Sequence, residues 1–339
     1  MIDWLTVRAK IDAPVDAGCV MSLTADGEIE WMTSKRLNVE GSHSSTVTVR
    51  RFPYDNSLEI SGNPAKFFQG HNLFGSDDLP GMSLAFCTAV CDRLGYRLTP
   101  AELEALHSGQ VKLTRVDVTQ SWNVGSLSRA LNVIRSLADS GIFAHRGRGS
   151  MTQEGTVYWR QKSRYLASKA YAKGHEIRAH KLPVQLVERD RLTEFAQGLV
   201  RFEFTLRSMW LQRKKLHVVQ NWPTLSATPE ALHSELMADL SVTDAEIPGD
   251  ELEGLPARLR LVYSAWKAGT DLRRTLPART FYRYRKQLLE YGIDLAALQP
   301  KKEASNVVPL KVVIHAQPVG VPSWAHGTLL YFQPPKLAA

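Results

Sequence analysis

The chain has 339 residues, of which 44% are hydrophobic, and its mean hydropathy is −0.22. This length suits two domains or one large domain with an appendage, and this composition excludes an intrinsically disordered chain. No stretch approaches the roughly 18 to 20 apolar residues of a membrane-spanning helix, so we expect a cytoplasmic protein without a membrane partner.

The net charge is +8, and it is concentrated in one segment. Residues 255–302 contain eleven basic and three acidic side chains, so that the rest of the chain is neutral overall. Concentrated positive charge is typical of a surface that binds a polyanion such as DNA. The alternative is a solvated basic face without a partner.

The spacing of apolar residues predicts an α+β fold in which helices cover one face of an antiparallel sheet. Up to residue 216, we expect in chain order a strand over 1–8, a strand over 46–51, helices over 83–94 and 100–106, a strand over 111–121, a helix over 127–138, strands over 156–159 and 165–175, a helix over 191–197 and a strand over 199–207.

Polar residues follow, and the acidic run over 243–253, which contains Pro248 and Gly249, predicts a linker. The pattern then becomes helical. The expected organisation is a domain over 1–220, a linker region over 221–254, a basic helical region over 255–300 and a β-like C-terminal tail over 301–339.

Three predicted strands carry polar side chains on one face, since residues two apart in a strand point the same way. These faces hold Arg115, Asp117 and Thr119 in the first strand, Tyr171, Lys173 and His175 in the second, and Arg201, Glu203 and Thr205 in the third. Gly174 permits a bulge that would turn Glu176 toward the same side.

Such a face suits phosphodiester chemistry. Two carboxylates hold a divalent cation through hard oxygen ligands, and the cation stabilises charge on phosphate oxygens. A tyrosine hydroxyl becomes a nucleophile where a base or a positive charge assists the loss of its proton. Taken singly, each residue has a plainer interpretation, because exposed acids are usually solvated or ion-paired and Tyr171 alone is an ordinary sheet residue.

Several segments carry a resemblance to a known family. The most specific is Asn-Pro-Ala-Lys-Phe-Phe-Gln-Gly-His-Asn-Leu-Phe-Gly at 63–75. Others, in matching order, are Leu-Thr-Arg-Val-Asp-Val-Thr at 113–119, Thr-Val-Tyr-Trp at 156–159, Ala-Tyr-Ala-Lys at 170–173 and Arg-Phe-Glu at 201–203. Together they resemble the gene II replication initiators of filamentous phages, the inoviruses, over nearly the whole chain.

The resemblance implies a rolling-circle initiator, a metal-dependent endonuclease and strand transferase acting in a bacterial host cell. Such a protein binds the viral origin, nicks the plus strand, stays joined to the 5′ phosphate and later reseals the strand. Its implied partners are origin DNA, both double-stranded and single-stranded, a host helicase and polymerase, and further copies of itself on the DNA.

The match to rolling-circle plasmid initiators also implies roles for single residues. Tyr171 would be the nucleophile and Lys173 a phosphate-stabilising cation. The ligands of Mg²⁺ or Mn²⁺ would be Asp117, Glu176 and Glu203. Tyr158 and Tyr165 remain alternative nucleophiles, and the His-hydrophobic-His metal motif of the better-known initiators is absent from the sequence.

Four residues of the first two matching segments are candidate DNA contacts, namely Lys66, His71, Asn72 and Arg115. For His71 and Asn72 two interpretations stay open. They form either a loop that touches DNA or the metal, or a tight turn in which His71 caps backbone groups.

The basic segment predicts a helix–turn–helix that would bind the major groove. Helices are expected over 258–267 and 278–291, with a short segment over 272–276 between them, and the second helix is opened by Pro277 and closed by Gly292. The candidate DNA contacts are Arg273, Arg274, Arg279, Tyr282, Arg283, Arg285 and Lys286. The alternative is a basic helix that packs on the sheet and aids solubility.

Two hypotheses for function follow. The first is a tyrosine-using nickase and ligase, which predicts a covalent protein–DNA adduct and a metal requirement. The second is an origin-binding or transcription-regulating protein with a catalytically silent sheet. A nucleotide-hydrolysing factor is disfavoured because the sequence has no Gly-x-x-x-x-Gly-Lys-Ser/Thr loop.

Overall fold

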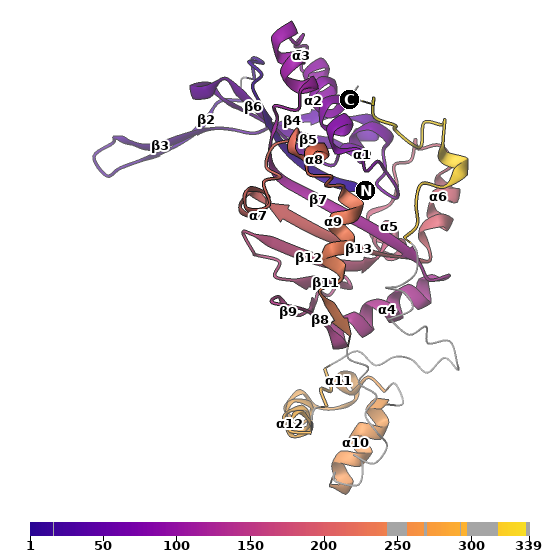
Figure 1. The fold of residues 1–339 in the computed structure, drawn as a ribbon. Helices are drawn as coiled ribbons and strands as arrows, with labels where there is room; N and C mark the ends of the chain where they lie inside the picture. The colour runs from indigo at the N-terminus through magenta and orange to yellow at the C-terminus, as the bar shows by residue number, and fades with distance from the viewer. Residues whose placement is uncertain (16, 243–255, 268–269, 292, 297–317, 337–339) are drawn as a thin grey trace.

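The computed structural model describes residues 1–339 except 16, 243–255, 268–269, 292, 297–317 and 337–339. A nine-stranded sheet with the order β10-β11-β12-β13-β7-β1-β6-β5-β4 dominates it, and its neighbouring strands are antiparallel (Figure 1). The strands are β1 (Ile2–Ala9), β4 (Leu37–Glu40), β5 (Thr46–Phe52), β6 (Ser57–Gly62), β7 (Lys112–Asn123), β10 (Ser150–Met151), β11 (Thr156–Trp159), β12 (Leu166–Ala172) and β13 (Leu199–Arg207). The predicted α+β antiparallel fold is confirmed.

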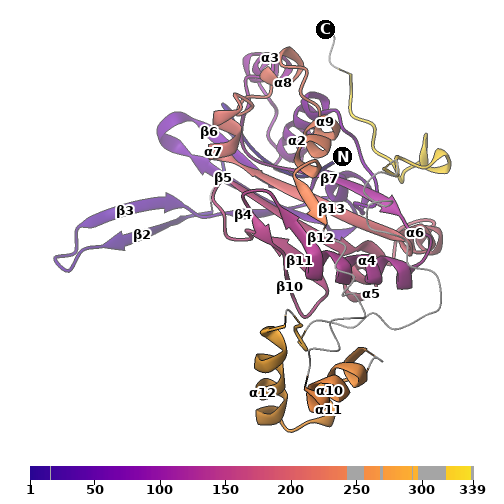
Figure 2. The ribbon, with the colours of Figure 1, turned by 60° about the horizontal axis from the view of Figure 1, so that its bottom comes forward.

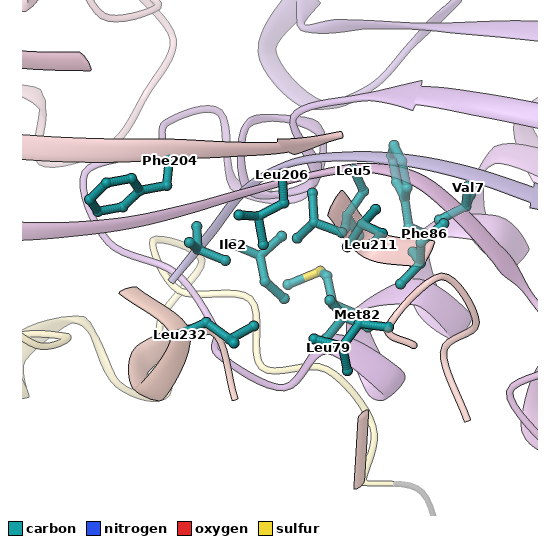
Figure 3. Packing of buried hydrophobic residues seen from close by; sticks show 14 of the residues in the cluster. Ile2, Leu5, Val7, Leu79, Met82, Phe86, Phe204, Leu206, Leu211 and Leu232 are labelled. Carbon is teal, nitrogen blue, oxygen red and sulfur yellow. The ribbon is translucent and has the colours of Figure 1, made fainter. Parts of the chain in front are cut away.

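Helices cover one face of this sheet because strand alternation collects the apolar side chains there. Leu5 and Phe204 on the strands meet Met82, Leu211 and Leu232 on helices in one buried cluster (Figure 3). The helices of this part are α1 (Pro64–Gln69), α2 (Leu79–Arg93), α3 (Pro100–His107), α4 (Leu127–Ser140), α5 (Lys173–His180), α6 (Arg189–Ala196), α7 (Ser208–Arg213), α8 (Asn221–Thr224) and α9 (Pro229–Met237).

Two smaller sheets accompany the large one. The strands β2 (Cys19–Leu23) and β3 (Ile29–Ser34) form a hairpin that projects from the body of the molecule (Figure 1). The strands β14 (Leu240–Val242), β8 (Gly141–Phe143) and β9 (Gly147–Arg148) form the other sheet.

The basic region forms a helical lobe, here called the C-terminal module, which consists of α10 (Ala257–Lys267), α11 (Leu272–Thr275) and α12 (Ala278–Leu289) (Figure 2). Its core is separate from that of the sheet and includes Leu259, Tyr263, Phe281 and Leu288. The two expected helices are present as α10 and α12, and the short segment between them forms a further helix, α11. None of the described helices combines the length and apolar character needed to cross a membrane.

The predicted strand over 165–175 is too long. β12 ends at Ala172 and α5 begins at Lys173, so the predicted bulge at Gly174 is wrong. Gly174 instead permits close packing of α5 on α6, because a Cβ there would lie 2.9 Å from the Ala196 carbonyl oxygen.

The predicted linker region over 221–254 is also wrong in its first part. Trp222, Leu232, His233 and Leu236 are buried, and α9 packs on the sheet. Polar residues between these apolar ones hid the amphipathic pattern. The predicted linker run over 243–253 lies outside the described residues.

The predicted β-like tail differs from the part of it that the structure describes. Residues 318–336 contain a 3₁₀ helix, η4 (Ser323–Ala325), and no strand, whereas the strand candidate at 307–314 lies outside the described residues. This segment returns to the sheet, where Phe332 stacks on Phe68 at a centroid distance of 3.8 Å and its amide donates to Gln69 Oε1 at 2.8 Å.

Candidate active site on the polar face of the sheet

The face of the sheet opposite the helices carries the predicted polar side chains. Directly opposite residues share a face, and in β13 Arg201 lies opposite Tyr171 of β12 while Glu203 lies opposite Lys169. On its other side, β13 lies beside β7, which contributes Asp117 to the same face. The prediction of one polar face is confirmed for Asp117, Tyr171, Arg201 and Glu203, and it is wrong for Lys173 and His175, which lie in α5 and not in a strand.

Tyr171 and Glu203 form the centre of the site. The Tyr171 hydroxyl donates a hydrogen bond to Glu203 Oε1, and Lys169 Nζ lies 2.8 Å from Glu203 Oε2. Burial and the Glu203 carboxylate raise the pKa of Tyr171 well above its ordinary value, while Arg201 acts in the opposite direction. Tyr171 is therefore a neutral phenol whose proton points at a carboxylate.

Arg201 is fully buried and joins the site to the segment after α1. Its guanidinium donates to Ser121 Oγ at 2.9 Å and to the carbonyl oxygens of Asn72 and Leu73 at 2.5 and 2.6 Å. Asp3 Oδ1 lies 3.9 Å away. Although burial opposes its charge, Asp3 has a lowered pKa because Arg201 and Lys173 are near. A buried cation thus lies beside the phenol.

The Gln-Gly-His-Asn segment is a tight turn. Gly70 ends α1 with a φ of +78°, which favours glycine. His71 is 1% exposed, and its Nδ1 accepts a hydrogen bond from the Leu73 amide at 3.3 Å. Asn72 donates to Asp3 Oδ1 at 2.7 Å. The structure favours the turn interpretation because both side chains are buried, and direct DNA contacts by these two residues stay a prediction.

A cavity of about 190 Å³ lies beside this turn. Its lining includes Lys66, His71, Lys173 and Glu176. Lys173 is 1% exposed, donates to Asn72 Oδ1 at 2.9 Å and lies 2.8 Å from Glu176 Oε2. Burial and Arg201 lower the pKa of Lys173 to about 8. The cavity has a mixed polar and apolar lining, with the cations Lys66 and Lys173 at its wall.

The three predicted metal ligands do not converge. Glu176 pairs with Lys173 on α5, whereas Asp117 forms a bidentate pair with Arg115 at 2.8 and 2.5 Å. Burial, Glu203 and Asp3 raise the pKa of Asp117, although Arg115 opposes them. Within the described ranges, no group of three His, Cys, Asp or Glu side chains has the geometry of a metal site. As they stand, these carboxylates do not fit a three-ligand cation site.

The two alternative nucleophiles, Tyr158 and Tyr165, lie in different surroundings. Tyr158 lies opposite Lys169 and so shares the polar face, while Tyr165 packs partly against the main core. Sequence reasoning missed Asp3 and Lys169, which complete the buried charge network. The strand period was the available signal for Lys169, which is two residues from Tyr171.

The predicted DNA contacts of the C-terminal module lie on or near α12. Arg274, Arg279, Tyr282, Arg283 and Lys286 are exposed. Four arginines of the predicted set have partners within the module. Arg285 forms a bidentate pair with Asp294 at 2.6 and 2.9 Å, and Arg274 lies 3.4 Å from Asp271 Oδ2. The Arg273 and Arg283 guanidinium groups lie 5.6 and 5.2 Å from the ring centroids of Phe281 and Tyr284.

Two known protein-family models match this chain. The family model for the N-terminal part of the phage replication-associated protein, the gene II product, matches residues 1–224, which hold the whole nine-stranded sheet. The chain belongs to the gene II replication-associated protein family. A second model, for the C-terminal part of the same protein, matches residues 255–329 and so spans the C-terminal module and part of the tail.

Among curated members of the family, the replication-associated protein of Enterobacteria phage I2-2 is 34% identical over 337 residues, which cover 95% of this chain and 96% of that protein. The replication-associated proteins of Enterobacteria phage M13 and Salmonella phage IKe are 26% and 24% identical, covering 75% and 81% of this chain and 73% and 77% of their own lengths. The resemblance to phage gene II initiators is thereby confirmed.

Proposed function

We propose that this protein is a rolling-circle replication initiator that binds a viral origin, nicks the plus strand through Tyr171 and reseals it. The Tyr171–Glu203 hydrogen bond on a cation-rich sheet face carries this proposal. The gene II relatives support the role in phage replication, because they are named replication-associated proteins.

In the proposed reaction, Glu203 accepts the phenolic proton as the Tyr171 oxygen attacks the scissile phosphorus. The bond between the phosphorus and the 3′ oxygen breaks, and the 5′ phosphate stays joined to Tyr171. The 3′ oxygen takes up a proton from solvent water and leaves as a hydroxyl, and Glu203 releases the phenolic proton to solvent. Attack by a 3′ hydroxyl reverses these steps and reseals the strand. Arg201 and Lys173 would stabilise negative charge on the phosphate oxygens.

A divalent cation, Mg²⁺ or Mn²⁺, is part of the proposal. Asp117 and Glu203 lie on neighbouring strands of the same face and offer carboxylate oxygens, which these cations prefer. Bound there, the ion would supply charge stabilisation at the phosphate. Glu176 would have to leave Lys173 to join them. Adduct formation that needs added Mg²⁺ or Mn²⁺ and stops with a chelator would support this part.

The C-terminal module would hold the duplex origin. Its exposed arginines on α12 suit phosphate and guanine contacts in the major groove. In the host cytoplasm, the nicked complex would act with a host helicase and polymerase, and several copies would assemble on the origin.

The burial of Tyr171, which is only 7% exposed, favours an alternative function, an origin-binding protein without nicking activity. An origin-binding protein with a silent sheet would have no need to expose this hydroxyl. The two functions differ in whether a covalent adduct forms.

The decisive experiment incubates the full chain with supercoiled or single-stranded DNA carrying the cognate intergenic region and Mg²⁺, followed by a denaturing gel. We expect a protein–DNA adduct that Tyr171→Phe abolishes and that Tyr158→Phe and Tyr165→Phe retain. An adduct that survives in Tyr171→Phe would move the nucleophile to another residue. Tight origin binding without nick or adduct would favour the alternative.

A further inference from the structure

Two arginines lie directly opposite each other on the polar face, beyond the proposed nucleophile. Arg207 at the end of β13 pairs in register with Arg115 of β7. Like charges in directly opposite positions destabilise a sheet. Asp117 compensates Arg115 with its bidentate pair, whereas no ion pair joins Arg207 to a described carboxylate, and its Nε is buried without a hydrogen-bond partner there. This arrangement favours the binding of an anion from another molecule by Arg207.

Aromatic rings accompany the arginines along the same face. The Arg115 guanidinium lies 4.9 Å from the Trp4 ring centroid. Farther along, the Arg8 guanidinium lies 3.8 Å from the Phe52 ring and 5.5 Å from the Tyr54 ring. Tyr54 is 77% exposed, so its ring is available to a ligand. Asp55 pairs with Arg8 at 2.6 Å as Asp117 pairs with Arg115, so Arg207 is the arginine of the three that has no described carboxylate partner. An uncompensated cation and an exposed ring on one face are typical of surfaces that hold phosphates and stack bases.

These residues form a path that continues from the proposed active site. The strand order places β12, with Tyr171, five strand spacings from β5, with Phe52, which is about 24 Å perpendicular to the strands. The register places Phe52 farther along the strand direction as well. Trp4 and Arg115 lie between the two ends, on β1 and β7. The path leads away from Tyr171, and its stacking rings suit unpaired bases, since a duplex hides the faces of its bases.

We propose that this path binds single-stranded DNA next to the nick. We name it the arginine–aromatic strip, and it consists of Arg207, Arg115, Trp4, Arg8, Phe52 and Tyr54. The inference that the bound strand is DNA rests on the proposed function. The binding itself does not require Tyr171 chemistry and is tested without it.

The test measures fluorescence anisotropy of a labelled oligothymidylate of about 12 nucleotides. The protein is the full chain carrying Tyr171→Phe, and excess unlabelled duplex occupies the C-terminal module. Stacking on one ring accounts for about a fivefold change in affinity or more, so Tyr54→Ala should weaken binding by at least that factor. Tyr54→Phe keeps the ring and should bind normally. Trp31→Ala, which removes an exposed aromatic of the β2–β3 hairpin, should have no effect.

Arg207→Gln separates a binding role from a structural one. Loss of one phosphate contact should reduce the slope of log affinity against log salt by about 0.7. Because the substitution removes a like-charge pair, the thermal midpoint should stay or rise. The matched control Arg213→Gln, on an exposed position of α7, should leave the slope unchanged.

Unchanged oligothymidylate binding in both Tyr54→Ala and Arg207→Gln would overturn the inference. So would an equal loss of binding to a labelled duplex, or a fall in the thermal midpoint of Arg207→Gln without a change in slope. The nicking assay is a separate readout, so a protein that binds through the strip but forms no adduct would refute only the proposed chemistry.

Discussion

Lys173 Nζ lies 2.9 Å from Asn72 Oδ1, although the two residues are 101 positions apart in the chain. The same Asn72 side chain donates to Asp3 Oδ1 at 2.7 Å. One amide thus satisfies a buried cation and a buried carboxylate at once, which an alanine cannot do. This bridge explains why a polar residue stands in a buried turn.

Asn72→Ala should therefore lower stability and activity together. Lys173 keeps Glu176 and Asp3 keeps Asn63, but each charged group loses one hydrogen bond. Loss of a hydrogen bond to a charged group costs about 1.5–3 kcal/mol, measurable as a shift in urea denaturation. With Lys173 held by Glu176 but no longer by Asn72, adduct formation should fall by about tenfold or more. The control Asn38→Ala removes an exposed amide of β4 and should change neither quantity. Normal adduct formation by Asn72→Ala would refute the positioning role.

Glu203→Gln should slow adduct formation because the amide cannot take the Tyr171 proton. General base catalysis contributes about 10²- to 10⁴-fold, so we expect a loss of that size in single-turnover rates, with origin binding retained. Glu194→Gln, an exposed carboxylate on α6, is the matched control. A rate within about threefold of the parent would exclude Glu203 as the base.

His233 should make stability depend on pH. Burial lowers the pKa of this residue to about 3, so the folded protein keeps it neutral while the unfolded chain takes up a proton below about pH 6.5. The folded state therefore loses stability as the pH falls. Between pH 7.5 and 5, this single group costs about 2 kcal/mol.

In His233→Gln that loss is absent. The difference in unfolding free energy between variant and parent should shift in favour of the variant by about 2 kcal/mol over this pH range, in urea titrations at matched ionic strength. His71, with its pKa also lowered to about 3 by burial, stays in both proteins and cancels in the comparison. A difference that does not vary with pH would contradict the assignment.

Arg279→Gln and Arg285→Gln should separate DNA contact from module stability. Arg279 is exposed, so its loss should weaken origin binding and reduce the salt slope by about 0.9 without a change in the thermal midpoint. Arg285 pairs with Asp294, so its loss should mainly lower the thermal midpoint. If both variants lowered only the midpoint, the proposed duplex contacts of α12 would be refuted.

Strand periodicity predicted much of the site from sequence. It placed Asp117, Tyr171 and Glu203 on one face, because alternation in a strand fixes the side of every residue at once. The same argument failed at Glu176. A helix start after Ala172 changes the period from 2 to 3.6, and Gly174 was compatible with either a bulge or a close helix contact.

Long-range partners lay beyond sequence reasoning. Nothing local to Asp3 or Asn72 indicates that Arg201 and Lys173 will meet them, because these contacts depend on the order of strands in the sheet. Polar composition also concealed α9, whose buried residues are spread among charged ones. Predictions from periodicity thus succeed within an element and fail between elements.

The return of residues 318–336 to the sheet has a consequence for the timing of synthesis. The Phe332 amide donates to Gln69 Oε1, and the Val319 amide donates to the carbonyl oxygen of Ser121, whose side chain accepts from Arg201. The ribosome makes Val319 and Phe332 after every strand of the large sheet. A nascent chain therefore carries Tyr171 and Glu203 long before their surroundings are complete. The surroundings of Tyr171 and Glu203 are therefore complete only after residues 318–336 have been made and have packed onto the body of the molecule.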